Sequence, residues 1–150
     1  MSIYFKAISL FIVLVVSDVL IGQPTYGQNL KLDWKSFEDA IEIAKTDQKP
    51  IMVDVWAPWC GWCKKMQKEV YPEHSETLKN DFILTRLNRD DNNSKVKYLD
   101  QSLSHLRLAQ RFNVQSVPAV VFLSADGNYL FHVSGYVEPQ KFKQVLMYID

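Results

Sequence analysis

Cys60 and Cys63 are the residues best suited to covalent chemistry, and they are the only cysteines of the chain. They stand in the segment Trp59-Cys60-Gly61-Trp62-Cys63, directly after an apolar run and at the start of a helical pattern. Two intervening residues let both sulfurs meet within one helical turn. A helix N-terminus stabilises a thiolate through its unpaired N–H groups and its dipole. The spacing therefore predicts a redox-active pair, with Cys60 as an exposed nucleophile and Cys63 as the more shielded resolving thiol.

Such a pair exchanges disulfides in two steps. The Cys60 thiolate attacks a substrate disulfide to form a mixed disulfide, and Cys63 then attacks Cys60 and releases the reduced substrate. Run backwards, the same steps oxidise a substrate. Because the cysteines themselves carry the electrons, we expect no cofactor and no bound metal. A second thiol–disulfide protein, in a membrane or in solution, must restore the pair after each turnover.

Two other roles for the cysteines stay open. The pair could form an inert structural disulfide, although so short a loop contributes little entropy. It could also bind a metal, above all a soft copper(I) ion, with help from His74, His105 or His132. None of these histidines stands at a usual zinc spacing from the pair. We expect His132 to be an ordinary strand residue.

Hydrophobic periodicity predicts the elements that position the pair. Four strands are expected, the first of them apolar and β-branched, over residues 51–57, 82–87, 119–123 and 129–133. Residues 125–128 are expected to form the turn between the last two strands. Four helices are expected, the first capped by Asp33 or Ser36 and the second ended by Pro72, over residues 33–45, 63–70, 94–112 and 138–149. The third helix would bury an apolar stripe made of Val96, Leu99, Leu103, Leu106 and Ala109.

The predicted order, α-β-α-β-α-β-β-α, is typical of an α/β fold. We expect a central mixed sheet flanked by helices on both faces. The 150 residues suit about one domain, and 47% hydrophobic with 23% charged residues is an ordinary globular composition. Lys and Arg number 17 against 17 Asp and Glu, which argues against binding of nucleic acid. We expect a monomer.

Residues 1–27 have the layout of a secretory signal peptide. A short segment containing Lys6 precedes an apolar run, and Asp18 interrupts that run before it could reach the length of a spanning helix. We expect cleavage before Gln28, which leaves residues 28–150 as the mature domain. An uncleaved anchor, which would tether the domain to a membrane, is the alternative. Export to the periplasm or the outside of the cell places the cysteines where disulfides persist.

Three segments resemble the thioredoxin superfamily. Val53-Asp54-Val55-Trp56-Ala57-Pro58-Trp59-Cys60-Gly61-Trp62-Cys63-Lys64-Lys65-Met66 is similar to its active-site segment. Val117-Pro118 and the strand after it resemble its cis-proline loop, and Ser134-Gly135-Tyr136 resembles its late glycine turn. The resemblance extends from about Leu32 to Ile149. It implies a thioredoxin-like fold and, together with the leader, an exported thiol–disulfide oxidoreductase.

The resemblance assigns roles to residues around the pair. Pro118 matches the cis-proline that faces the cysteines, and Val117 would offer its backbone groups to an extended substrate. Asp54 matches a buried acid, whose pKa burial would raise and which could accept the Cys63 proton through water. An ordinary trans proline and a solvated Asp54 are the alternatives. Arg86 lies roughly where the family carries a basic residue near that acid, and a surface arginine is equally compatible with the sequence.

The same resemblance implies a substrate-binding surface. It comprises residues beside the cysteines and in the two loops that face them, namely Trp59, Gly61, Trp62, Val117 and Gly135. Trp59 could instead belong to the core. Trp62 replaces the proline found between the cysteines of thioredoxins, which leaves the reducing strength open and adds aromatic surface for docking of a protein. We therefore predict reduction of disulfides in exported proteins. An oxidase or isomerase, and a copper-handling or peptide-binding module, are the alternatives.

Overall fold

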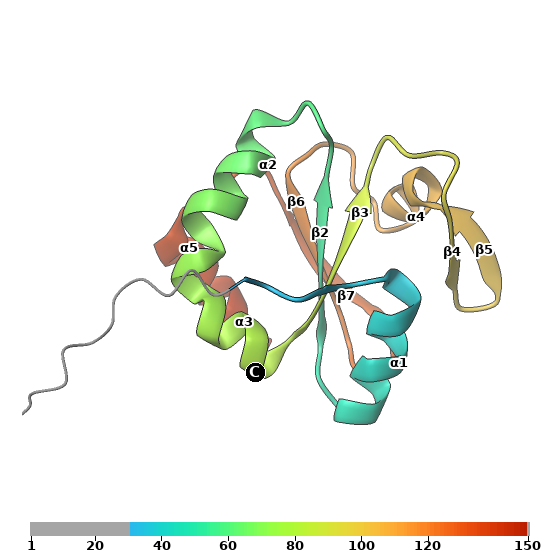
Figure 1. Ribbon diagram of the computed structural model, residues 1–150, viewed down its shortest axis with the longest axis horizontal. Helices are drawn as coiled ribbons and strands as arrows, with labels where there is room; N and C mark the ends of the chain where they lie inside the picture. Colours follow the sequence, from blue (N-terminus) through green and yellow to red (C-terminus); the bar gives the residue numbers. More distant parts are fainter. Residues whose placement is uncertain (1–30, 150) are drawn as a thin grey trace, which may run out of the picture.

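The computed structural model describes residues 31–149, so the predicted leader and its cleavage site lie outside the described residues. A five-stranded mixed sheet of order β1-β3-β2-β6-β7 forms the centre (Figure 1). Its strands are β1 Trp34–Lys35, β2 Ile51–Trp56, β3 Ile83–Asn88, β6 Ala119–Leu123 and β7 Tyr129–Ser134. The strands β1, β3 and β2 run parallel, whereas β6 runs antiparallel to β2, and β7 runs antiparallel to β6.

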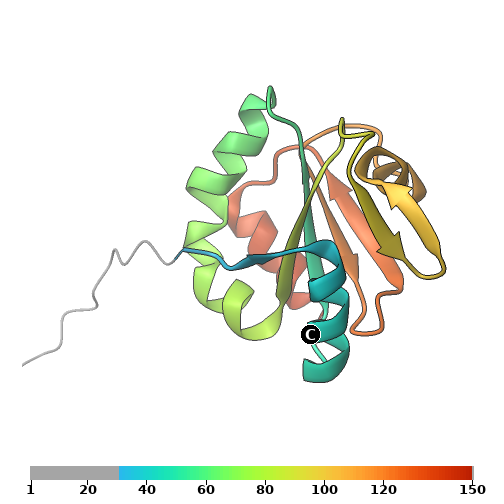
Figure 2. The same cartoon turned by 45° about the vertical axis from the view of Figure 1, so that its right-hand side comes forward.

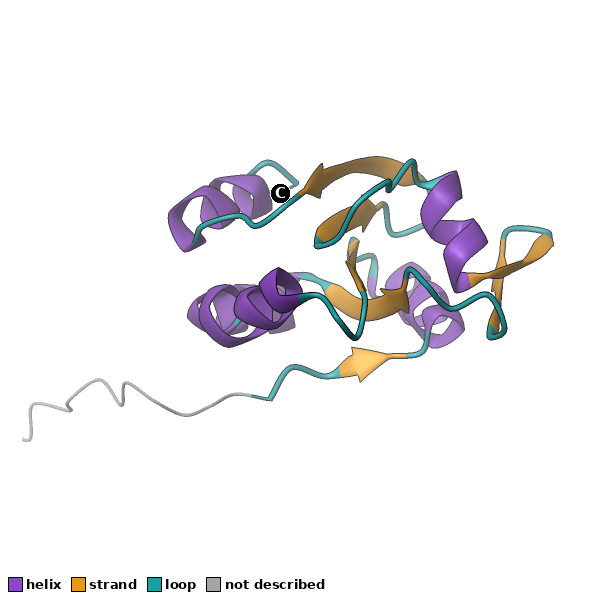
Figure 3. Ribbon diagram, turned by 90° about the horizontal axis from the view of Figure 1, so that it is seen from above, coloured by secondary structure: helices purple, strands orange, loops and turns teal. Residues whose placement is uncertain are grey.

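Helices cover both faces of this sheet, as Figure 3 shows from above. The helices are α1 Phe37–Asp47, α2 Gly61–Lys65, α3 Ser75–Asp81, α4 His105–Arg111 and α5 Pro139–Met147. Side chains of β2 alternate between two cores, because successive strand residues point to opposite faces. Val53 packs with α1 and α4, whereas Met52 packs with the segment after the cysteines and with α5. The prediction of an α/β fold with helices on both faces is confirmed.

The predicted helix over residues 94–112 is wrong in its first half. Residues Lys95–Tyr98 and Gln101–Ser104 form β4 and β5, a two-stranded sheet beside α4 (Figure 2). Buried and exposed residues alternate along β4, as a strand requires, with Val96 and Tyr98 buried. Leu99 is 53% exposed instead of belonging to a buried stripe. The helix begins only at His105, after Ser104 accepts a hydrogen bond from the Arg107 N–H.

Two other predicted boundaries also differ. The first helix begins at Phe37, because the Ser36 side chain accepts from the Asp39 N–H, and Trp34 instead pairs with Leu84 in a parallel strand. Pro72 does not end the helical segment after the cysteines. It opens a 3-10 turn, where a missing N–H costs nothing, and α3 follows. Within residues 31–149, no helix has both the length and the apolar character that crossing a bilayer requires.

Candidate active site

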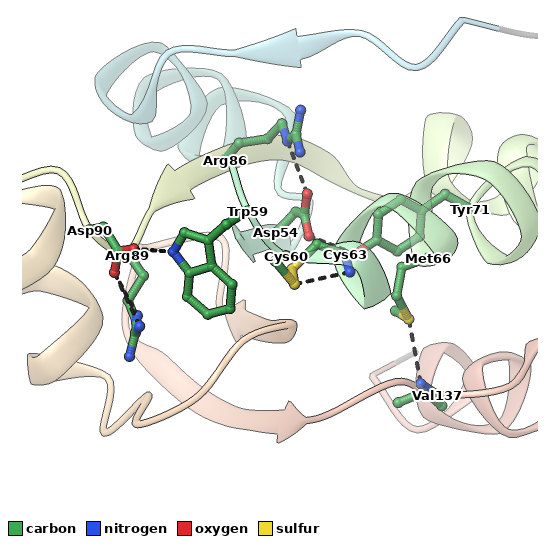
Figure 4. Close-up of a disulfide and its surroundings, with 10 residues drawn as sticks. All are labelled: Asp54, Trp59, Cys60, Cys63, Met66, Tyr71, Arg86, Arg89, Asp90 and Val137. Atoms are coloured by element: carbon green, nitrogen blue, oxygen red, sulfur yellow. Dashed lines mark hydrogen bonds and ion pairs between the residues drawn. A yellow bond between two sulfur atoms is a disulfide. The ribbon is translucent and has the colours of Figure 1, made fainter. Parts of the chain in front are cut away.

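The two cysteines form a disulfide at the N-terminus of α2. The Sγ atoms are 2.04 Å apart and the Cα atoms 5.3 Å apart. Cys60 is the N-cap residue, and the Cys63 N–H points at the Cys60 sulfur at 3.1 Å (Figure 4). After reduction, a backbone N–H directed at this sulfur favours its thiolate. The predicted pairing and placement of the two cysteines therefore match the structure.

The expected exposure of Cys60 is wrong for this disulfide form. Cys60 is only 3% exposed and Cys63 1%. The Cys60 sulfur is bonded inward to Cys63, and Ala57, Trp56 and Val117 pack around the pair. A partner sulfur must therefore displace part of this cover to reach Cys60.

The loop before β6 lies against the cysteines. The Val117–Pro118 peptide bond is cis, and Val117 is partly buried against the disulfide. The Pro118 carbonyl accepts a hydrogen bond from the Gly135 N–H at 2.8 Å. Gly135 has a positive φ of 84°, a conformation that glycine adopts readily. This hydrogen bond joins the two loops that the sequence assigned to the substrate-binding surface.

Asp54 lies on β2 and is completely buried. It shares a sheet face with Met52, the face covered by the helical segment that begins at Cys60. Arg86 Nε donates to Asp54 Oδ2 at 2.9 Å, and the Tyr71 hydroxyl donates to Oδ1 at 2.8 Å (Figure 4). Burial raises the Asp54 pKa, and this effect exceeds the lowering by the Arg86 charge and by the two hydrogen bonds. The carboxyl group therefore holds a proton more readily than an exposed aspartate does.

Trp59 is 65% exposed and does not belong to the core. Its indole Nε1 donates to Asp90 Oδ2 at 2.6 Å. Arg89 pairs with the same Asp90 carboxylate and donates to the Gln115 carbonyl, two residues before Val117. This chain of contacts connects the residue before Cys60 to the cis-proline loop.

Trp62 is 58% exposed and forms a second aromatic surface beside the cysteines. Its ring packs on Tyr136 with a centroid separation of 5.2 Å. The Lys65 ammonium lies 5.2 Å from the Trp62 centroid and 4.8 Å from the Tyr136 centroid. Gly61 lies between the cysteines, exposed, with open space where a Cβ would be. The two indoles, next to Cys60 and Cys63 in the chain, thus provide exposed apolar surface near the disulfide.

The histidines occupy separate positions. His132 lies on β7 as predicted, with its Nδ1 2.8 Å from the Tyr129 hydroxyl. His74 Nε2 lies 2.9 Å from the Pro139 carbonyl oxygen. His105 begins α4. In the part of the chain that the structure describes, no three His, Cys, Asp or Glu side chains gather as metal ligands would.

Sequence reasoning assigned no role to the side chains of Tyr71 and Tyr136 and placed Arg86 only loosely. Tyr71 stands eight residues after Cys63, a spacing that falls on the buried face of a helix, and a buried phenol needs a hydrogen-bond partner. That signal was available. Tyr136 gave no such signal, because only the folded chain brings α5's preceding loop against Trp62.

A thioredoxin fold carrying a cysteine pair at a helix N-terminus defines the class of this domain. The chain belongs to the thioredoxin-like domain family, whose model matches residues 37–150. It is similar to the thiol:disulfide interchange protein DsbD of Yersinia enterocolitica, with 28% identity over 138 residues, or 87% of this chain and 22% of DsbD. It is also similar to the disulfide bond reductase DsbH of Chlamydia pneumoniae, with 28% identity over 100 residues, or 66% of this chain and 60% of DsbH.

The chain thus spans about a fifth of the length of DsbD. Among solved structures, a DsbH oxidoreductase matches with a TM-score of 0.63 and 23% identity, over 82% of this chain and 94% of that one. This structural likeness supports the fold.

Proposed function

We propose that this domain is a thiol–disulfide oxidoreductase that reduces disulfides in exported proteins. The observation that carries the proposal is the Cys60–Cys63 disulfide, formed at the N-cap of α2 with a backbone N–H directed at the Cys60 sulfur. A short disulfide in this position is suited to exchange, because the helix terminus stabilises the thiolate of the first cysteine after reduction.

The reaction follows from the order of the two sulfurs. In the reduced protein, the Cys60 thiolate attacks one sulfur of a substrate disulfide. A Cys60–substrate bond forms, the substrate S–S bond breaks, and one substrate thiolate leaves and takes a proton from solvent. Cys63 then loses its proton and attacks Cys60 Sγ, which closes the protein disulfide and expels the second substrate thiolate. The substrate gains two electrons, and the cysteine pair loses them.

Asp54 is the proton acceptor in the second step. Its carboxylate lies on the β2 face that the Cys63-bearing segment covers, and its raised pKa makes it a better base than an exposed aspartate. A base whose pKa lies nearer the working pH transfers protons more effectively. The proton passes from Cys63 to Asp54 through a water molecule, and Asp54 then gives it up, through solvent, to the departing substrate thiolate.

The substrate binds over the cysteines as an extended segment. Val117 offers backbone groups beside the disulfide, while the proline after it has no N–H to compete. Trp59 and Trp62 supply exposed aromatic surface on which a protein substrate can pack. Gly61 leaves room beside Cys60, and Gly135 supports the cis-proline loop through its hydrogen bond to Pro118.

Reduction, as opposed to oxidation, is supported by two observations. The similar Chlamydia protein is named a disulfide bond reductase, and Asp54 is a completely buried acid on the sheet face covered by the helical segment that carries Cys63. Export rests on the signal-like sequence of residues 1–27. A thiol–disulfide protein in the membrane or in solution would return electrons to the pair, and the domain would act as a monomer.

The proposal is tested by reduction of insulin disulfides with dithiothreitol as electron source. The wild-type domain should accelerate the reaction, Cys60→Ser should abolish the acceleration, and Cys63→Ser should accumulate mixed disulfides with insulin. A redox potential near thioredoxin's −270 mV would agree with reduction, whereas one near the −120 mV of DsbA would indicate an oxidase. Tight copper(I) binding by the reduced protein without turnover would replace the proposal by a copper-handling module.

A further inference from the structure

The Asp54 carboxylate is held by a different element at each of its two oxygens. Arg86, from β3, donates to Oδ2, and Tyr71, from the end of the helical segment that carries the cysteines, donates to Oδ1. The Arg86 pair follows from strand register, since the two residues are Cα partners. The Tyr71 contact joins the carboxylate to the segment that carries Cys63.

Tyr71 is fixed in place by its surroundings. It is 1% exposed, and its ring centroid lies 6.0 Å from that of Trp34 and 5.7 Å from that of Phe142. Packing on both sides restricts the ring to one position, with its hydroxyl on Asp54. A buried phenol that donates to a carboxylate makes a strong, charge-assisted hydrogen bond.

A π-helical turn separates Cys63 from Tyr71. This turn, η1, spans Met66–Val70, and the Tyr71 N–H closes it on the Met66 carbonyl at 3.0 Å. Such single π-turns occur often at functional sites. Here one continuous helical segment carries both the resolving cysteine and the hydroxyl that holds its proton acceptor.

We propose that Tyr71 is a positioning residue for thiol–disulfide exchange, whose hydroxyl orients the Asp54 carboxylate and stabilises its charged form for proton transfer from Cys63. This inference rests on the proposed function. The hydroxyl touches neither sulfur nor substrate, and it acts only through Asp54. Losing it would leave Oδ1 without its donor in a site closed to solvent.

Within residues 31–149, the side chains that shift the Asp54 pKa come from two elements. Arg86 faces it from β3 and Tyr71 from the helical segment, while β6 contributes the apolar Val120 as its register partner. Reduction of the Cys60–Cys63 disulfide would add the Cys63 thiol to the groups that can exchange a proton with this carboxylate. The hydrogen bond from Tyr71 lowers the Asp54 pKa, against the larger raising by burial. Removal of the hydroxyl must therefore raise the Asp54 pKa further.

The test compares Tyr71→Phe with the matched variant Tyr98→Phe. Tyr98 is another buried tyrosine packed between aromatic rings, but its hydroxyl donates to the Gly127 carbonyl at 3.0 Å. Both variants lose one buried phenolic oxygen. Two quantities are measured against pH: the Asp54 carboxyl carbon shift by NMR, which needs no turnover, and the rate of insulin reduction.

The Asp54 titration midpoint and the acid limb of the rate profile should both move upward in Tyr71→Phe, by about one pH unit, since a hydrogen bond to a charged group commonly contributes that much. Neither should move in Tyr98→Phe. In an Asp54→Asn background, Tyr71→Phe should leave the rate profile unchanged, because the hydroxyl has lost the group through which it acts.

An unchanged Asp54 midpoint in Tyr71→Phe would overturn the inference and leave the proposed exchange intact. An effect of Tyr71→Phe on the rate profile that persists in Asp54→Asn would also overturn it, because the hydroxyl would then act by another route. A wild-type domain that reduces no disulfide at any pH would instead overturn the proposed function itself, whatever the midpoint does.

Discussion

Asp54 and Arg86 are paired across two neighbouring parallel strands, where their Cα atoms are register partners and Arg86 Nε lies 2.9 Å from Asp54 Oδ2. The guanidinium is itself packed between two indoles, 4.6 Å from the Trp56 centroid and 5.2 Å from the Trp34 centroid. Even so, this pairing does not offset burial, and the Asp54 pKa stays raised. Removing both charges of a buried ion pair from water costs free energy of folding, which their mutual attraction does not always offset.

Asp54→Asn should therefore change how stability depends on pH. Between the ordinary Asp pKa of 3.8 and its raised native value, the folded protein keeps a proton that the unfolded chain releases. The free energy of unfolding of the wild type thus falls as pH rises through this window, with a slope of at most about 1.4 kcal/mol per pH unit for one proton. The variant should lack that decline. Urea unfolding of the oxidised protein across this pH range measures it.

Asp91→Asn provides a control of opposite sign. Hydrogen bonds from Ser94, and then the Asn93 N–H, lower the Asp91 pKa to about 2. Stability from this group is present above pH 3.8 and is lost as pH falls towards 2. In Asp91→Asn, the free energy of unfolding should no longer fall through Asp91 as the pH drops towards 2. Its fall with rising pH, which is due to Asp54, should remain. Identical pH profiles for the two variants would contradict both assignments.

The strand that bears Asp54 could be predicted from sequence, but the donors on its carboxylate could not. An apolar β-branched run marks β2, and the cysteine motif directly after it sets where the site lies. The register of β2 against β3 depends on how the whole sheet assembles. The sequence could therefore place Arg86 only roughly near Asp54 and could not predict their contact. Local patterns contain no information about such long-range pairing.

The hairpin of β4 and β5 shows a different limit. Val96, Leu99 and Leu103 recur at helical intervals, yet Val96 and Tyr98 are also apolar positions two residues apart, with lysines between and before them, as on a strand. The segment forms a strand because Tyr98 packs edge-on against Phe37 of α1 and against Phe112. Periodicity in the sequence does not encode such tertiary contacts. Leu99 then takes a positive φ of 53° at the turn, where sequence rules would expect Gly or Asn.

Trp62→Ala should impair the reduction of a protein substrate more than that of a small disulfide. The indole is 58% exposed and packs on the partly buried Tyr136 instead of entering the buried core. We expect the KM for insulin to rise several-fold, with stability changed by less than about 0.5 kcal/mol. The rate with a small aromatic disulfide should stay within a factor of two or so.

Tyr148→Ala is the matched control for Trp62→Ala. Tyr148 is an even more exposed aromatic residue, at 81%, but it lies at the end of α5 and packs on Phe131. Its removal should leave the KM for insulin unchanged. Equal increases in KM for both variants would show that nonspecific apolar surface, and not the surface beside the cysteines, binds insulin.

Val117→Ala should speed attack on the protein disulfide. Val117 packs against the cysteine cluster, and Cys60 is only 3% exposed beneath this cover. Trimming two methyl groups widens the approach to the Cys60 sulfur, so reduction of the disulfide by dithiothreitol should accelerate several-fold. Val133→Ala, at a partly buried position on β7 outside the cluster that covers the cysteines, should react like the wild type. A slower or unchanged Val117→Ala would show that other groups limit access.

Gly61 and Gly135 should respond to alanine in opposite directions, although at both positions a new Cβ would meet no atom within 4 Å beyond the local backbone and the neighbouring residues. Gly135 has a φ of +84°, which an L side chain rarely adopts, so Gly135→Ala should lower the free energy of unfolding by about 1 kcal/mol or more. Gly61 opens α2 with no such constraint. Gly61→Ala should therefore raise that free energy by about 0.4–1 kcal/mol, because it restricts the unfolded chain. Denaturant unfolding of both oxidised variants measures these changes. The equal open space at the two positions would predict equal effects, whereas the difference in backbone conformation predicts effects of opposite sign.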